Sequence, residues 1–73
     1  MNKVAFLRRG YNITQETISN TLNISRVTFR KKERGDVDWT KNEMEKLTAL
    51  FREYDSSLNM EKIFFDNNFT VRK

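Results

Sequence analysis

Residues 14–35 read TQETISNTLNISRVTFRKKERG. Thr14 and Ser25 belong to the residue types that cap helix N-termini, and Gly35 is placed to end a helix in left-handed backbone. This stretch therefore predicts two consecutive short helices, over residues 15–22 and 26–33.

The connection between these two helices is too short for them to lie in line. Only Asn23 and Ile24 separate the first helix from the cap of the second, and the free backbone groups at each helix end need partners. Asn tolerates the left-handed backbone that a sharp bend uses. We expect the helices to cross at a steep angle, with the small Ser19 where they come closest. The inward apolar residues are Ile18, Leu22, Ile24 and Phe29.

Another helix is expected ahead of this pair, over residues 2–9. Asn2 is placed as its cap and Gly10 as its left-handed exit. We expect its buried side to consist of Val4, Leu7 and Phe6.

The chain after the pair predicts two more helices. Residues 40–43 read Thr-Lys-Asn-Glu, which matches the capping box and opens a helix that runs to about Tyr54. Residues 60–65 are typical of a brief final helix. We expect Val37 and Trp39, in the short link before the capping box, to fold back onto the core. The apolar stripe at helical spacing in the longer helix is Met44, Leu47, Leu50, Phe51 and Tyr54.

The composition agrees with a helical chain. The 73 residues include no proline and two glycines, too few turn residues for a many-stranded β domain. We expect an all-α fold, a compact bundle of about five short helices, in one domain over residues 1–65 with a C-terminal tail over residues 66–73.

Several function classes are excluded by residue type. Without Cys or His the chain has no thiol or imidazole for disulfides, zinc sites of the usual kinds or Ser-His catalysis. Asp36, Asp38 and Glu43 lack the spacing of a calcium loop. We expect no enzyme activity, no cofactor and no metal. The longest apolar runs, over residues 4–7 and 63–65, are too short to span a membrane, which predicts a cytoplasmic protein.

The charge is concentrated in the first half of the chain. Residues 1–34 hold eight basic and two acidic side chains, a net charge of +6, and residues 35–73 hold six and eight, a net charge of −2. A polyanion would therefore bind to the basic half.

The stretch over residues 14–35 and the helices expected around it resemble the phage repressor and Cro family of helix-turn-helix DNA-binding proteins, the XRE-like proteins. The resemblance covers roughly residues 4–52 and is most specific at residues 14–16, 24–25 and 33–35, while residues 61–65 look like the ending of small phage-encoded Cro-like regulators. It implies a lambda-repressor-like domain with the helix-turn-helix at residues 14–34. It also implies an ion pair between Arg8 and Glu33. The chain departs from the family at Asn23, where glycine is usual, and at Lys32, where an aliphatic residue is usual.

Contacts with DNA follow from the geometry of a helix in the major groove. The outward positions of the second helix of the pair are Arg26, Val27, Arg30 and Lys31, and these are the candidate base readers. Arg26 suits a bidentate contact with guanine and Val27 suits a thymine methyl group. The resemblance points to Arg26, Val27 and Lys31 in the same role. The resemblance also implies contacts with the DNA backbone at Thr28 and Gln15, the latter at a helix N-terminus that favours phosphate. The other candidate phosphate contacts are Lys32, Arg34, Lys41 and Asn42.

Two hypotheses for the function stay open. The first is a sequence-specific transcriptional regulator of the Cro/repressor type that binds a double-stranded DNA operator in a phage lysis–lysogeny switch, in the bacterial cytoplasm near the nucleoid. The alternative is a helix-turn-helix antirepressor, or modulator of repression, that binds a partner phage repressor. An exposed Val27, and Lys32 at a normally apolar position, suit such a protein contact.

A homodimer is also considered, because one helix pair makes few DNA contacts. Its surface is expected in the C-terminal part of the chain. Alternatively, Ile63 and Phe64 simply cover the core of a monomer. The candidate interface residues are Leu58, Met60, Ile63, Phe64, Phe65 and Phe69.

Overall fold

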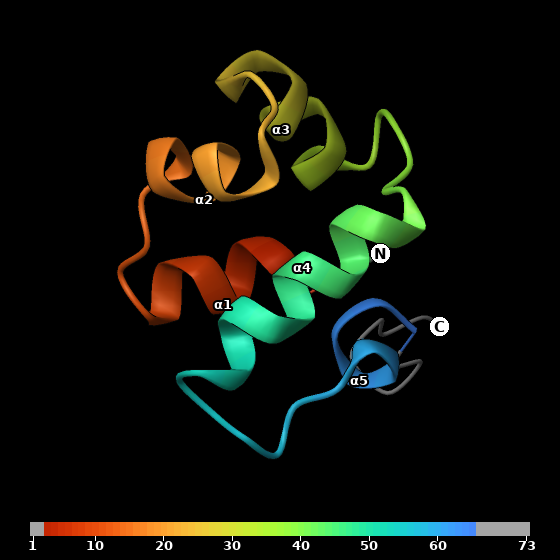
Figure 1. Cartoon of the computed structure of the whole chain (residues 1–73). Coiled ribbons are helices and arrows are strands. Elements are labelled where there is room, and N and C mark those ends of the chain that lie inside the picture. The colour runs from red at the N-terminus through yellow and green to blue at the C-terminus, as the bar shows by residue number, and fades with distance from the viewer. Residues whose placement is uncertain (1–2, 66–73) are drawn as a thin grey trace.

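The computed structural model describes residues 3–65, which fold into five α-helices (Figure 1). The predicted all-α class is confirmed, since residues 3–65 contain no strand. The helices are α1 (Val4–Gly10), α2 (Gln15–Leu22), α3 (Arg26–Arg34), α4 (Lys41–Arg52) and α5 (Met60–Phe64).

Helices α2 and α3 begin at the two predicted caps. The Thr14 hydroxyl accepts a hydrogen bond from the Thr17 amide at 3.0 Å, and the Ser25 hydroxyl accepts one from the Thr28 amide at 3.1 Å. Each cap satisfies an amide that no helical carbonyl can reach. The predicted bounds of α2 are confirmed, and α3 continues to Arg34, one residue beyond its predicted end.

The bend between α2 and α3 depends on left-handed backbone at Asn23, where φ is 59° and ψ is 43°. The amides of Asn23 and Ile24 donate to carbonyls in the last turn of α2, at 3.1 and 3.0 Å. Ser19 is buried, as expected at the point of close approach. Gly35, with φ of 90°, closes α3 in the same left-handed region.

Helix α1 differs from its prediction at both ends. Asn2 lies outside the described residues, and Lys3 occupies the cap position without a side-chain cap. Gly10 is the last helical residue, and the left-handed turn lies at Asn12, with φ of 59°. Phe6 was expected to be buried but is 64% exposed. It follows Val4 by two positions, which in a helix turns it to the opposite side.

Helix α4 opens with the predicted capping box. The Thr40 amide donates to Glu43 Oε1 at 2.9 Å, and the Glu43 amide donates to the Thr40 hydroxyl at 3.1 Å. The helix ends at Arg52, so Tyr54 lies beyond it. Tyr54 is half exposed and stacks on Tyr11 with ring centroids 4.7 Å apart.

Helix α5 begins at a cap that the sequence analysis did not assign. The Asn59 side chain accepts a hydrogen bond from the Lys62 amide at 2.8 Å. The helix is one residue shorter than expected, because it ends at Phe64. Its carboxyl end is tied to the start of α1 by a hydrogen bond from the Lys3 amide to the Ile63 carbonyl at 2.9 Å.

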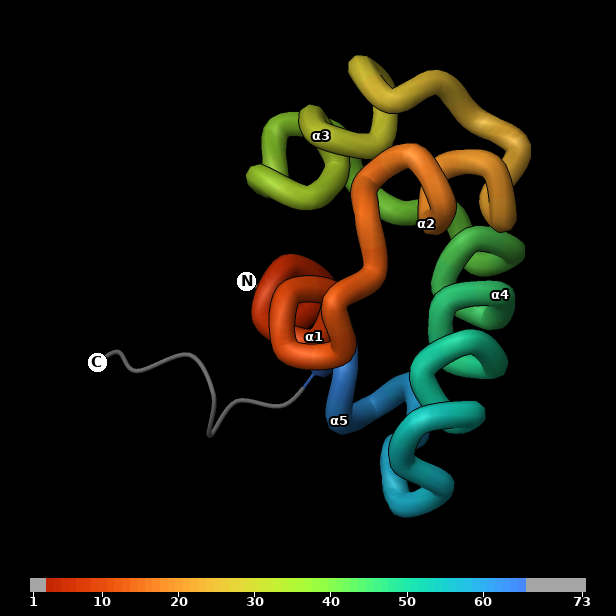
Figure 2. Tube along the Cα trace, turned by 90° about the vertical axis from the view of Figure 1, so that its left-hand side faces the viewer, coloured from red at the N-terminus to blue at the C-terminus, as the bar shows by residue number. Residues whose placement is uncertain are grey.

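Apolar side chains from all five helices form one core. Both Figure 1 and Figure 2 show α2 and α3 at one end of the molecule and α5 at the other, with α1 and α4 between them. Helix α4 contacts both α2 and α5 and so connects the two ends. The buried apolar residues are Val4, Leu7, Ile13, Ile18, Leu22, Phe29, Leu47, Phe51, Leu58, Ile63 and Phe64.

The link between α3 and α4 contributes one large side chain to this core. Trp39 packs with its ring centroid 5.6 Å from that of Phe29 and 6.1 Å from that of Phe64. The expectation is therefore correct for Trp39. It is wrong for Val37, which is 43% exposed. Within residues 3–65, no helix combines the length and the apolar character that crossing a membrane requires.

Candidate nucleic-acid interface

The solvent-facing side of α3 carries the four predicted base readers. Arg26, Arg30 and Lys31 are exposed, and Val27 beside them is 56% exposed. None of these three cations forms an ion pair or side-chain hydrogen bond with another of residues 3–65. Their charges are therefore free to attract an anion from solvent.

The one acidic residue of α3, Glu33, points into the molecule. Its Oε2 lies 2.7 Å from Arg8 Nε, and its Oε1 accepts a hydrogen bond from Gln15 Nε2 at 3.0 Å. Arg8 also donates to the Ile13 carbonyl at 3.1 Å, which fixes its guanidinium group between α1 and α2. The ion pair that the resemblance implied is thus confirmed. Because Arg8 and Gln15 hold the Glu33 carboxylate inside, the exposed face of α3 carries no acidic side chain.

Lys32 is not part of that face, and its predicted contact with phosphate is wrong. The residue is 7% exposed, and its Nζ donates to Glu43 Oε1 at 2.6 Å. A buried ammonium group is stable only when it is paired, and Glu43 at the start of α4 supplies the partner. Lys32 therefore lies inside the protein, with its apolar stem buried.

Glu43 is a structural residue that the sequence analysis recognised only as a helix cap. Its Oε1 accepts hydrogen bonds from both the Thr40 amide and Lys32 Nζ, so the capping box and the buried ion pair share one oxygen. Burial of Glu43 opposes its ionisation, but the hydrogen bonds from Lys32 and Thr40 and the charge of Lys32 hold the pKa of this carboxyl below its ordinary value. A lysine at an apolar position of α3 was the available signal that an internal acid had to exist.

The other predicted phosphate contacts lie in the first turns of α2, α3 and α4 and at the end of α3. Gln15 and Thr28 are half buried in the first turns of α2 and α3. Arg34 is exposed and pairs with Asp36 at 2.8 Å, a pair so solvated that it contributes little and leaves the guanidinium group able to exchange partners. Lys41 and Asn42, in the first turn of α4, are exposed and have no side-chain partner within the described part of the chain.

The predicted dimer surface is wrong for three of its six residues. Leu58, Ile63 and Phe64 are buried within the single chain, where Ile63 and Phe64 cover the core. Met60 is half buried against that core and Phe65 is 58% exposed. Phe69 lies outside the described residues. The α5 segment uses its apolar side chains to complete a thin core, which leaves little of them for a partner.

These observations define a class of protein, a small all-α chain in which the exposed residues of α3 are cationic or apolar and none is acidic. Comparisons of the chain with protein-family models, with curated proteins and with solved structures give no match.

Proposed function

We propose that this protein is a sequence-specific DNA-binding regulator of transcription, in which α2 and α3 form a helix-turn-helix of the Cro/repressor type. One observation carries the proposal. The exposed face of α3 holds Arg26, Arg30 and Lys31 without an acid, because Glu33 is held inside by Arg8 and Gln15. A helix with a cationic face and buried acids suits a polyanionic groove.

The proposed reading of bases follows the order of residues along α3. Arg26, at the N-terminal end, is set to donate two hydrogen bonds to a guanine, and the exposed Val27 is set to pack on a thymine methyl group. Arg30 and Lys31 lie one turn further and reach bases or phosphates deeper along the groove. Gln15 uses the second hydrogen of its amide for a flanking phosphate, since the first is donated to Glu33.

Regulation would follow from occupancy of an operator, as in a phage lysis–lysogeny switch. Two copies would each insert α3 into successive major grooves, about 34 Å apart, and block access of polymerase or of a competing repressor. Phe65, which is 58% exposed, remains the candidate contact between the copies. Analytical ultracentrifugation with and without DNA distinguishes a preformed dimer from one that assembles on the operator.

Under the modulator hypothesis, Val27 and Lys32 were expected to suit a contact with a partner protein, and only Val27 remains available. Lys32 is buried against Glu43 and is not presented to a partner protein. Val27 stays exposed, but a thymine methyl group explains it equally well. The DNA-binding proposal is therefore the one we carry forward, with the modulator as an outcome of its test.

The test is selection of duplexes from a randomised double-stranded library by the purified protein, followed by titration of the selected duplex at several salt concentrations. We expect an enriched motif, with log K falling steeply and linearly as log salt rises. Arg26→Ala should cost about 1–3 kcal/mol on the selected duplex and relax the preference at one base pair. Lys46→Ala, which removes one exposed charge from α4, is the matched control and should keep the preference.

The proposal fails if no motif is enriched and Arg26→Ala binds duplexes as the wild type does. Under the modulator hypothesis the protein alone binds DNA weakly and without preference, and it forms a stable complex with a phage repressor. Titrating the repressor in the same assay separates the two.

A further inference from the structure

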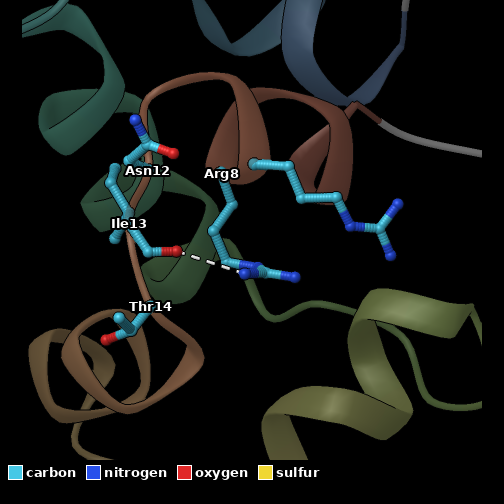
Figure 3. Close-up of a pocket in the computed structure, with 5 residues that line it drawn as sticks. Arg8, Asn12, Ile13 and Thr14 are labelled. Atoms are coloured by element: carbon cyan, nitrogen blue, oxygen red, sulfur yellow. Dashed lines mark hydrogen bonds between the residues drawn. The ribbon is translucent and has the colours of Figure 1, made fainter.

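A hollow of about 380 Å³ lies where α1 leads into α2 (Figure 3). Its lining residues are Arg8, Arg9, Asn12, Ile13 and Thr14. The hollow is open to solvent along most of its rim, so it does not enclose a small molecule as a typical ligand pocket does. An open hollow of this kind suits a chemical group that is presented on the surface of a larger partner.

The walls of the hollow are fixed by backbone hydrogen bonds. The amides of Asn12 and Ile13 reach back to the carbonyls of Arg9 and Arg8, at 3.1 and 2.9 Å, and Asn12 takes left-handed backbone to allow this. Figure 3 shows the hydrogen bond that the Arg8 guanidinium group donates to the Ile13 carbonyl, and both residues line the hollow. A ligand here would meet a shape that is already formed, which lowers the entropic cost of binding.

The charge of the hollow is positive and comes from one residue. Arg8 is neutralised by Glu33, whereas Arg9 is exposed and has no ion-pair partner among residues 3–65. The Thr14 hydroxyl is already used, since it donates to Thr17 and accepts from its amide. The free donors are therefore the Arg9 guanidinium group and the Asn12 side-chain amide. The guanidinium fork and the neutral amide both line the hollow, and both kinds of donor suit phosphate oxygens.

We propose that this hollow receives a backbone phosphate of the bound duplex, held by Arg9 and Asn12. The inference rests on the proposed function and adds a contact outside the helix pair. The hollow adjoins the candidate interface directly, because Thr14 precedes Gln15 and Arg8 links the hollow through Glu33 to α3. A phosphate next to the one at Gln15 would thus anchor the duplex against α1 and fix the depth of α3 in the groove.

The test uses the selected duplex and the variant Arg9→Ala. We expect binding about tenfold weaker, by a similar factor on every sequence, and a slope of log K against log salt that is shallower by about 1. Lys46→Ala removes the same charge elsewhere and should change the slope much less. Asn12→Gly keeps the left-handed backbone and removes only the amide, so it should weaken binding several-fold without loss of thermal stability.

A second arm locates the phosphate. Duplexes with one phosphate replaced by a neutral methylphosphonate are titrated in turn with the wild type and with Arg9→Ala. At the position that occupies the hollow, the replacement should lower the DNA affinity of the wild type about tenfold. It should leave the affinity of Arg9→Ala unchanged, because that variant has already lost the contact.

The outcomes separate this inference from the function on which it rests. If the wild type enriches a motif but Arg9→Ala and Lys46→Ala keep the same salt slope, the hollow holds no phosphate and the inference is overturned alone. The inference is also overturned if every methylphosphonate lowers the DNA affinity of Arg9→Ala as much as that of the wild type. If the wild type enriches no motif, the proposed function fails and the inference fails with it.

Discussion

The buried ion pair between Lys32 and Glu43 gives the most demanding prediction for this structure. We expect Lys32→Met and Glu43→Gln each to destabilise the protein, and the double substitution to cost far less than their sum. The physical reason is that each single substitution leaves the other residue of the pair charged and without its partner. Both side chains are about nine-tenths buried, so an unpaired charge there is costly.

The magnitudes follow from the contacts. Removing one partner of a buried pair costs about 3–5 kcal/mol, and we expect about 3 kcal/mol for each single substitution. The lower end applies because Glu43 keeps its hydrogen bond from the Thr40 amide, while the Lys32 ammonium group can extend toward solvent. The double substitution leaves no buried charge, so it should cost about 3 rather than about 6 kcal/mol, a coupling of about 3 kcal/mol.

The assay is urea unfolding at neutral pH, followed by the fluorescence of Trp39. This residue is the single tryptophan of the chain and packs against α3 and α5, so it reports on the whole core. A domain of 73 residues has a free energy of unfolding of about 4–11 kcal/mol, so the single variants remain measurable. Lys46→Met, at an exposed lysine of α4, is the control and should stay within about 0.5 kcal/mol of the wild type.

A coupling below about 0.5 kcal/mol would refute the reasoning, since that value is typical of an exposed and screened pair. It would mean that Lys32 lies in solvent, and its contact with phosphate would then have to be considered again.

The remaining predictions concern one carboxyl group, one turn and one cap. Folding lowers the pKa of Glu43, so the contribution of this carboxylate to stability is present above its ordinary pKa of 4.5 and is lost as the pH falls through the lowered value. Glu43→Gln should therefore flatten the fall of the urea midpoint on acidification. A variant with the same pH profile as the wild type would contradict this. Asn23→Gly should change the free energy of unfolding by less than about 1 kcal/mol, while Asn23→Val should lower it by roughly 2 kcal/mol, because a β-branched residue resists left-handed backbone. Equal melting temperatures for the two variants would contradict left-handed backbone at Asn23. Thr40→Ala should cost about 1 kcal/mol through the lost cap and leave the DNA affinity of the folded protein unchanged, so loss of binding by a folded variant would show a direct contact.

The candidate site combines features that have different origins. The exposure of Arg26 and Val27 follows from the register of α3, which the sequence contains. Which charges that face carries depends on where Glu33 and Lys32 point, and both point inward to partners on other helices. The face is therefore a product of the packing of α3 against α1 and α4.

The sequence by itself determined the helices and the bend between α2 and α3. Thr14, Ser25 and Thr40 each bind an amide three residues further on, and Asn23 and Gly35 supply left-handed backbone at their own positions. Such interactions span at most one helical turn, so residue type and spacing are enough to predict them.

The tertiary structure alone decided which side chains are available to a partner. Whether Lys32 faces solvent depends on Glu43, which lies on another helix, and whether Ile63 and Phe64 meet a second chain depends on the core that α1 to α4 leave open. The hollow beside Arg9 likewise forms only when the turn at Asn12 folds back on α1. Burial and pairing depend on contacts between elements that are distant in the chain. A local pattern of residues therefore does not predict them.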